Sequence, residues 1–156
     1  MQNIRENTTL PTLHKLSSGG VIRQEQEIRV AEEYMKKLHI KAPGIFQKTK
    51  NLSGGNQQKV MLARWIYADP DVLILDEPTR GIDVGAKYEI YCIINALAQQ
   101  GKSVVVISSE LPEVLGISDR VYVMNEGRFV GELSANEASQ ENVMRCIMQS
   151  NEKKAS

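Results

Sequence analysis

Two spacings of apolar residues divide this chain. Across residues 23–38 the apolar positions recur every three to four residues, with Glu and Lys between them, which predicts an amphipathic helix. From residue 72 the pattern changes, because residues 72–75 and 104–107 are continuous apolar runs, typical of strands buried on both faces. A helical pattern over residues 86–99 lies between them, and Gly101 ends it. We therefore expect an α/β fold whose parallel strands are joined by right-handed crossovers.

The flanking segments carry further helical and turn signals. The first fifty residues predict a helical unit without strands, in which residues 17–20, Ser-Ser-Gly-Gly, form a loop. Beyond the second apolar run we expect a short helix, a hairpin and a last helix that residues 134–136 cap; these cover residues 110–115, 121–133 and 138–148. The chain thus divides into residues 1–50, residues 51–150 and a frayed tail at residues 151–156.

Composition narrows the classes of function. The 156 residues suffice for one domain of ordinary size. Lys plus Arg and Asp plus Glu number 19 each, so no net charge draws the chain toward nucleic acid or an acidic membrane. No apolar run approaches the roughly 20 residues that cross a bilayer, and residues 1–10 lack the apolar centre of a signal peptide. Cys92 and Cys146 do not have the spacing of metal ligands. We therefore expect them to be reduced packing residues of a cytosolic protein.

The candidate binding element is a turn at residues 51–59, Asn-Leu-Ser-Gly-Gly-Asn-Gln-Gln-Lys, which opens a predicted helix. Glycine amides at a helix start form an anion site, because unpaired N–H groups point outward and the helix dipole favours negative charge. Gly54 and Gly55 let a ligand approach the backbone, and the Ser53 hydroxyl can donate to a phosphate oxygen. Taken alone, a Gly-Gly turn that caps an ordinary helix explains the same residues.

A second candidate site follows the first apolar run. Asp76 and Glu77 stand directly after residues 72–75, at the carboxyl end of the predicted strand. Open α/β sheets bind ligands at this end of their strands. One carboxylate there suits a magnesium ion, and the next can orient or deprotonate a water molecule.

This order of a Ser-Gly-Gly turn, a helix and a strand that ends in Asp-Glu resembles the ATP-binding-cassette (ABC) ATPases. Three stretches are similar to the second ATPase domain of bacterial monosaccharide importers of the ribose, xylose and galactose type: LSGGNQQK at residues 52–59, DEPTRGIDVGAK at 76–87 and ISSELPE at 107–113. The resemblance covers nearly all of the chain. It implies a P-loop NTPase fold, with residues 1–50 as a segment of the helical subdomain and residues 51–150 as the signature helix and the C-terminal part of the ATPase core.

The resemblance also implies a role for the Ser-Gly-Gly turn. ABC ATPases work as head-to-tail pairs, in which the signature turn of one domain closes over ATP held by the phosphate loop of the other. Ser53, Gly54 and Gly55 would then contact the γ-phosphate on a partner domain, with Asn56 and Gln57 nearby.

Further roles concern the domain's own nucleotide site. By the same resemblance, Asp76 would hold Mg²⁺ through water and Glu77 would polarise the attacking water. Asp83 matches the loop that contacts the partner across the dimer. ATP and Mg²⁺ are therefore the expected ligands, and both need a phosphate loop.

Two features depart from the family pattern. The sequence contains no G-x-x-x-x-G-K-[ST] loop, and Gly101-Lys102-Ser103 is a decoy, because it follows a helix and enters a strand. We therefore expect a truncated fold that lacks the first strands and the phosphate loop, with an open sheet edge and an uncovered apolar face that favour aggregation. Ser109 occupies the switch position, where most members carry a histidine, which counts against hydrolysis at the site of Glu77. Alternatively, Ser109 caps the helix over residues 110–115.

The resemblance implies partners and a location. They are a second ATPase domain, membrane permease subunits and, indirectly, a periplasmic sugar-binding protein, at the cytoplasmic face of the inner membrane. Residues 23–50 correspond to the surface that faces the membrane subunits. Trp65 is expected to pack on the apolar side of the signature helix, and His39 to lie solvated at a helix end.

Three functions remain open at this point. The first is an ATP-binding or ATPase component, in part, of a sugar importer. The second is a non-catalytic remnant that binds no nucleotide alone and at most complements a partner domain. The third, a soluble ABC protein of DNA repair or translation, is disfavoured by the absence of a basic tract and by the sugar-type stretches at residues 56–58 and 108–110.

Overall fold

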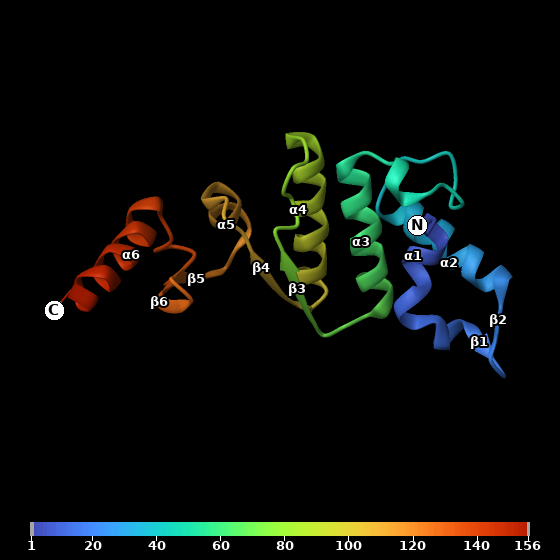
Figure 1. The fold of residues 1–156 in the computed structure, drawn as a ribbon, viewed down its shortest axis with the longest axis horizontal. Helices are drawn as coiled ribbons and strands as arrows, with labels where there is room; N and C mark the ends of the chain where they lie inside the picture. The colour runs from blue at the N-terminus through green and yellow to red at the C-terminus, as the bar shows by residue number, and fades with distance from the viewer. Residues whose placement is uncertain (1, 156) are drawn as a thin grey trace. The chain divides into compact units, whose positions relative to one another are not determined.

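The computed structural model describes residues 2–155 and divides the chain into two units, Met1–Ile107 and Ser108–Ser156. Figure 1 follows the order of the elements along the chain. The first unit contains α1 (Ile4–Thr9), a 3-10 helix η1 (Leu10–Leu16), β1 (Ser17–Ser18), β2 (Val21–Ile22), α2 (Gln24–Lys37), the 3-10 turn η2 (Thr49–Asn51), α3 (Gly54–Ala68), β3 (Val72–Asp76), α4 (Val84–Gln99) and β4 (Ser103–Ile107). The second contains α5 (Leu111–Ile117), β5 (Arg120–Asn125), β6 (Arg128–Ser134) and α6 (Gln140–Ala155).

The start of the chain folds onto the two longer helices that follow it. Asn3 and Glu6 form a capping box, in which each side chain accepts from the other residue's backbone N–H, at 2.9 and 3.1 Å. α1 packs against both α2 and α3 and buries Ile4 completely. Glu27 of α2 accepts a hydrogen bond from the Thr9 hydroxyl at 2.8 Å. Arg64 of α3 donates to the carbonyl oxygen of Asn7 at 3.1 Å, so polar contacts join α1 to both helices.

The prediction that the first third has no strand is wrong. β1 and β2 form a short antiparallel hairpin, with Ser17 opposite Ile22 and Ser18 opposite Val21. Gly19 and Gly20 both have positive φ values, +58° and +81°, which is the backbone of the tight turns that favour Gly-Gly. The expected loop is therefore the turn of a hairpin.

α2 ends at Lys37, within one residue of the predicted end at residue 38, and His39 just beyond it adopts a left-handed conformation with φ +50°. The His39 N–H donates to the Lys36 carbonyl at 3.1 Å and the Ile40 N–H to the Met35 carbonyl at 2.9 Å. This pair of bonds is a Schellman motif, which satisfies carbonyls at a helix end. It fixes the segment that leaves α2.

The two apolar runs form the parallel pair that the sequence predicts. β3 and β4 pair in parallel, from Val72 opposite Ser103 to Asp76 opposite Ile107. Figure 1 shows α4 as the crossover between them, with α3 beside it, and α4 packs against both α3 and β4. Leu73 and Leu75 are buried, as are three residues of α4: Ile90, Ile94 and Leu97.

The opposite face of this sheet is exposed, so the prediction that both strands are buried on two faces is wrong. Val72 and Ile74 of β3 are 57% and 64% exposed, and Val105 and Ile107 of β4 are also exposed. Burial in β3 thus alternates with period two. The expected uncovered apolar face is present in this unit.

Three boundaries and one side chain differ from the predictions. α4 begins at Val84, two residues early, because Asp83 caps it. α6 begins at Gln140, after Ser139, whose hydroxyl accepts from the Asn142 N–H at 3.2 Å, and continues to Ala155 rather than ending at residue 148. Trp65 is 43% exposed rather than packed inside.

The second unit contains the predicted hairpin. β5 and β6 are antiparallel, with an irregular register between Val123 and Met124, and α6 packs on both strands. A Cβ placed on Gly131 would lie 2.5 Å from the Cys146 sulfur, so glycine allows α6 to sit this close to β6. Cys146 is a free thiol that packs between α6 and the hairpin.

Within residues 2–155, no helix is long and apolar enough to span a membrane. The three-part division at residues 50 and 150 stays a prediction.

Candidate functional site

The Ser-Gly-Gly turn opens α3 as predicted. Ser53 occupies the N-cap position with extended backbone (φ −61°, ψ 156°), and Gly54 begins the helix. The first i to i+4 bond runs from the Gln57 N–H to the Ser53 carbonyl at 2.9 Å. The N–H groups before it lie at the positive end of a 15-residue helix, where the chain can bind an anion.

The two glycines also have a packing role that the sequence analysis missed. A Cβ on Gly55 would lie 2.6 Å from the Ala86 Cβ, a distance that side chains do not tolerate. A Cβ on Gly54 would lie 3.2 Å from Cγ2 of Ile82. Gly55 therefore allows the start of α3 to touch the start of α4, in addition to leaving backbone amides accessible.

A polar pocket of about 260 Å³ opens where α3 and α4 begin, and we call it the signature pocket. Four of its lining residues were predicted as site residues: Ser53, Gly55, Asn56 and Asp83. Lys41, Lys59, Gly85, Ala86 and Glu89 complete the lining. Gln57 does not line it; its side chain donates to the Leu52 carbonyl at 2.9 Å.

One carboxylate oxygen of Asp83 has a structural role. Its Oδ1 accepts from the Ala86 N–H at 2.9 Å and thereby caps α4. The cap holds the start of α4 against Gly55. The role of Asp83 in a contact across a dimer stays a prediction.

An ion pair between a buried lysine and a partly exposed glutamate lines the signature pocket and was not predicted. The Lys59 side chain is 2% exposed; its ammonium lies 2.7 Å from a carboxylate oxygen of Glu89 and donates to the His39 carbonyl at 3.0 Å. The hydrogen bond from Lys59 to Glu89 holds the pKa of Glu89 below its ordinary value. Lys59 thus joins α3 to α4 and to the end of α2.

The predicted magnesium and water carboxylates lie at the carboxyl end of β3. Asp76 is the last residue of β3, with an exposed side chain, and Glu77 follows in a left-handed conformation with φ +47°. The Glu77 N–H donates to the Ile107 carbonyl at 2.8 Å, which continues the pairing of the strands by one residue. Glu77 therefore turns away from the strand direction at a defined point.

The carboxylates at the end of β3 could supply part of the ligand set of a magnesium ion. Among the described residues no three His, Cys, Asp or Glu side chains cluster closely enough to hold a metal ion. Mg²⁺ keeps several waters and takes one or two carboxylates plus substrate phosphates, so the single exposed carboxylate of Asp76 suits that role.

Ser109 belongs to the second unit, and the idea that it caps the following helix is wrong. α5 begins after Glu110, and Ser108 supplies the hydroxyl at its start. The Ser108 hydroxyl accepts from the Glu110 N–H at 3.0 Å and donates to Glu113 at 2.5 Å. The assignment of Ser109 to the switch position stays a prediction.

The sequence and the fold both match known proteins. The sequence profile described as ABC transporter matches residues 1–80, more than half of the chain. The L-arabinose transport ATP-binding protein AraG of Geobacillus stearothermophilus is 58% identical over 94% of this chain and 29% of its own length. For the xylose import ATP-binding protein XylG of Thermoanaerobacter pseudethanolicus the identity is 53%, and for the ribose import ATP-binding protein RbsA of Bacillus cereus it is 56%, each again over 29% of the relative.

Solved structures share the fold. An ATP-binding cassette described as a dimer in a post-hydrolysis state, bound to ADP and Pi, is 26% identical, with a TM-score of 0.74 over 86% of this chain and 57% of that chain. A putative metal-chelate type ABC transporter gives a TM-score of 0.78 at 18% identity, over 94% of this chain and 58% of that chain.

This chain belongs to the ABC transporter family and has the α/β fold of its ATPase domains. It is similar to the ATP-binding proteins of sugar importers and spans 29% of the length of these relatives.

Proposed function

We propose that this chain supplies the signature half of a composite ATP site in a sugar ABC importer. The observation that carries the proposal is the signature pocket, in which Ser53 and the amide end of α3 lie beside Asp83. Ser53, Gly54 and Gly55 bind the γ-phosphate of ATP that a second ATPase domain holds on its phosphate loop. Asn56 and Gln57 shape the first turn behind them. In this arrangement the site is complete only when two ATPase domains meet.

The chain's own residues favour the phosphate in two ways. The helix dipole and the N–H groups before Gln57 attract negative charge, and the Ser53 hydroxyl donates a directed hydrogen bond. Such donors act best where charge accumulates on the transferred phosphoryl group, because they need no reorganisation as the reaction proceeds.

Asp76 and Glu77 serve the site on this chain's own side of the pair. There Mg²⁺ would neutralise phosphate charge, with Asp76 holding its water shell, and Glu77 would orient the attacking water and accept its proton. Ser109 would hold the switch position, where it can donate a hydrogen bond but has no imidazole to exchange protons.

The proposed transport substrate is a monosaccharide. The arabinose, xylose and ribose ATP-binding proteins named above are 53–58% identical to this chain over at least 91% of its length. A periplasmic binding protein and the permease would select the sugar, whereas this chain would couple ATP hydrolysis to its passage.

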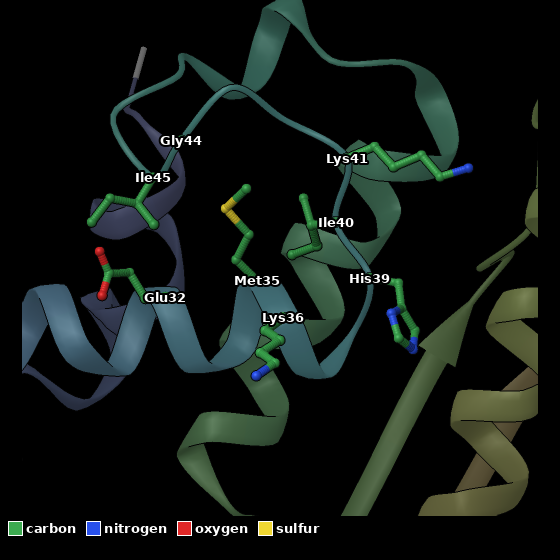
Figure 2. A pocket seen from close by; sticks show the side chains of 8 residues that line it. All are labelled: Glu32, Met35, Lys36, His39, Ile40, Lys41, Gly44 and Ile45. Carbon is green, nitrogen blue, oxygen red and sulfur yellow. The ribbon is translucent and has the colours of Figure 1, made fainter.

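The proposed permease contact lies on the helical part of the first unit. A pocket of about 530 Å³ lies between α2 and residues 39–45, lined by Met35, Ile40 and Ile45 with charged residues around them. Figure 2 shows Met35 rising from α2 toward the segment that carries Ile40 and Ile45, while Lys41 extends away from α2. A short segment of a membrane subunit would seat here, which would place the chain at the cytoplasmic face of the inner membrane.

A second function fits one observation. The sequence contains no G-x-x-x-x-G-K-[ST] loop, so the chain alone is expected to bind ATP weakly or not at all. It would then act only as a complement to another ATPase domain. Titration of the isolated chain with ATP tests this directly, since submicromolar binding would contradict it.

The test of the main proposal uses an assembly of this chain, the permease and an ATPase domain that carries a phosphate loop. Ser53→Ala should lower ATP turnover roughly 10- to 100-fold, the range for loss of a hydrogen bond to a charged group. Ser18→Ala, at an exposed serine of β1, is the matched control and should leave turnover unchanged. Equal turnover of the assemblies that carry Ser53→Ala and Ser18→Ala would overturn the proposal.

A further inference from the structure

We propose that Asn56 is a positioning residue that sets the direction of the Ser53 hydroxyl and links it to residues 39–41. The inference rests on the proposed function, because it concerns how Ser53 meets a phosphate. Asn56 sits between the two: its Oδ1 accepts from the Lys41 backbone N–H at 2.8 Å, and its Nδ2 donates to Ser53 Oγ at 2.9 Å.

The orientation of the Asn56 amide follows from chemistry. A backbone N–H can only donate, so the Asn56 atom that faces Lys41 must be the carbonyl oxygen. The other amide atom is then the nitrogen, which must donate to Ser53 Oγ.

The hydrogen bond from Asn56 determines whether the Ser53 hydroxyl can donate to a ligand. A serine hydroxyl has one hydrogen and two lone pairs, and Asn56 occupies one of the lone pairs. The hydroxyl hydrogen cannot point at Asn56, because two hydrogens would then face each other. Among residues 2–155 no side chain or carbonyl accepts this hydrogen, and Ser53 is exposed at the signature pocket. Asn56 therefore leaves Ser53 ready to donate to an anion that enters there.

The anchor for Asn56 is itself fixed. The Schellman motif at His39 sets the path out of α2, and the His39 carbonyl accepts from buried Lys59. Lys41 follows two residues later and lines both the signature pocket and the pocket of Figure 2. A shift of residues 39–41 would therefore change the acceptor geometry at Asn56 and, through it, the direction of the Ser53 hydroxyl.

Asn56→Asp separates these functions, because it keeps an acceptor for Lys41 but removes the donor to Ser53. The carboxylate would accept the Ser53 hydroxyl hydrogen and turn it away from the ligand. In the assembly used for Ser53→Ala, we expect Asn56→Asp to lower turnover roughly 10-fold or more. Asn136→Asp, at an exposed asparagine between β6 and α6, is the matched amide-to-acid control and should change turnover less than twofold.

The double variant distinguishes positioning of Ser53 from simple charge repulsion. If Asn56 acts through Ser53, Ser53→Ala with Asn56→Asp should lose no more turnover than Ser53→Ala alone. Multiplicative losses would show that Asn56 acts independently and would overturn the inference. A full loss with Ser53→Ala and none with Asn56→Asp would also overturn it and leave the proposed function standing. No loss with Ser53→Ala would instead refute the proposed function.

Amide hydrogen exchange on the full chain supplies a readout without turnover. The Lys41 amide should exchange roughly 5- to 10-fold faster in Asn56→Ala than in the unmodified chain, and should stay protected in Asn56→Asp. Unchanged exchange in Asn56→Ala would show that the link to residues 39–41 is absent.

Discussion

The two predicted phosphate-facing regions of this molecule are built differently. At the start of α3, hydrogen bonds and an ion pair from α3, α4 and the segment after α2 hold Ser53, Asn56 and Lys59 in place. At the end of β3, Asp76 and Glu77 close a two-stranded sheet whose far face exposes Ile74 and its neighbours. The signature region is thus held by several polar contacts. The sheet that carries the carboxylates has one buried face and one exposed face.

This difference fits a division of labour. A preformed donor site can wait for ATP that another domain brings, because its geometry needs no ligand to assemble it. In the proposed function, the carboxylates would act on a nucleotide that this sequence has no phosphate loop to hold.

The largest expected effect separates the two faces of β3. Leu75→Ala should lower the free energy of unfolding by about 2–5 kcal/mol, because it leaves a cavity at the buried face of the sheet. Ile74→Ala, one residue away on the exposed face, should cost less than about 1 kcal/mol. Urea unfolding of both variants measures the difference. Equal losses would mean that the far face is covered in the folded chain.

The next effect tests the close approach of α3 and α4. Gly55→Ala places a methyl group 2.6 Å from the Ala86 Cβ and should cost about 1–3 kcal/mol of stability. Gly44→Ala, where a Cβ meets nothing within 4 Å, is the control and should be nearly neutral. Adding Ala86→Gly to Gly55→Ala should recover part of the loss in thermal unfolding, and no recovery would contradict the packing described here.

A smaller effect concerns the ion pair of Lys59 and Glu89, which line the signature pocket. Lys59→Met keeps the length of the side chain but leaves the His39 carbonyl and Glu89 without their cation, so we expect a loss of about 1–3 kcal/mol. Lys48→Met, at an exposed lysine, should have little effect. If both substitutions lower the melting temperature equally, Lys59 does not join the three segments.

The smallest effect is a pH dependence. Lys59 lowers the pKa of Glu89 in the folded chain, so the unfolded chain takes up this proton at higher pH. The stabilisation is therefore present above the ordinary glutamate pKa and is lost as the pH falls through the lower folded value. Melting temperatures from pH 7 down to pH 3 should fall less steeply for Glu89→Gln than for the unmodified chain, and parallel curves would contradict the assignment.

The sequence predicted the local elements better than the contacts between them. Continuous apolar runs identified the parallel pair β3–β4, and a glycine-containing turn identified the hairpin β5–β6. The apolar runs alone predicted burial on both faces, because a short run of apolar residues is the same whether one face or two are covered, and only the expected truncation predicted an uncovered apolar face. The hairpin β1–β2 was missed because its strands have only two residues each.

The candidate site shows the same limit. The spacing and residue types identified Ser53, Gly55, Asn56 and Asp83, and the structure brings these four to one pocket. Lys59 and its partners were missed, since Glu89 lies 30 residues further along and the contact with His39 is made through a backbone carbonyl. Long-range polar contacts of this kind leave no periodic signal in a sequence.

The most direct measurement of the central claim is photo-crosslinking from the γ-phosphate of an ATP analogue that is bound to the partner's phosphate loop. In the assembly of this chain with the partner ATPase domain and the permease, the label should reach residues 53–57 at the start of α3. The isolated chain should remain unlabelled. Labelling of the isolated chain to the same extent, or of the assembly only at sites away from the start of α3, would contradict the claim that this chain completes a nucleotide site on another domain.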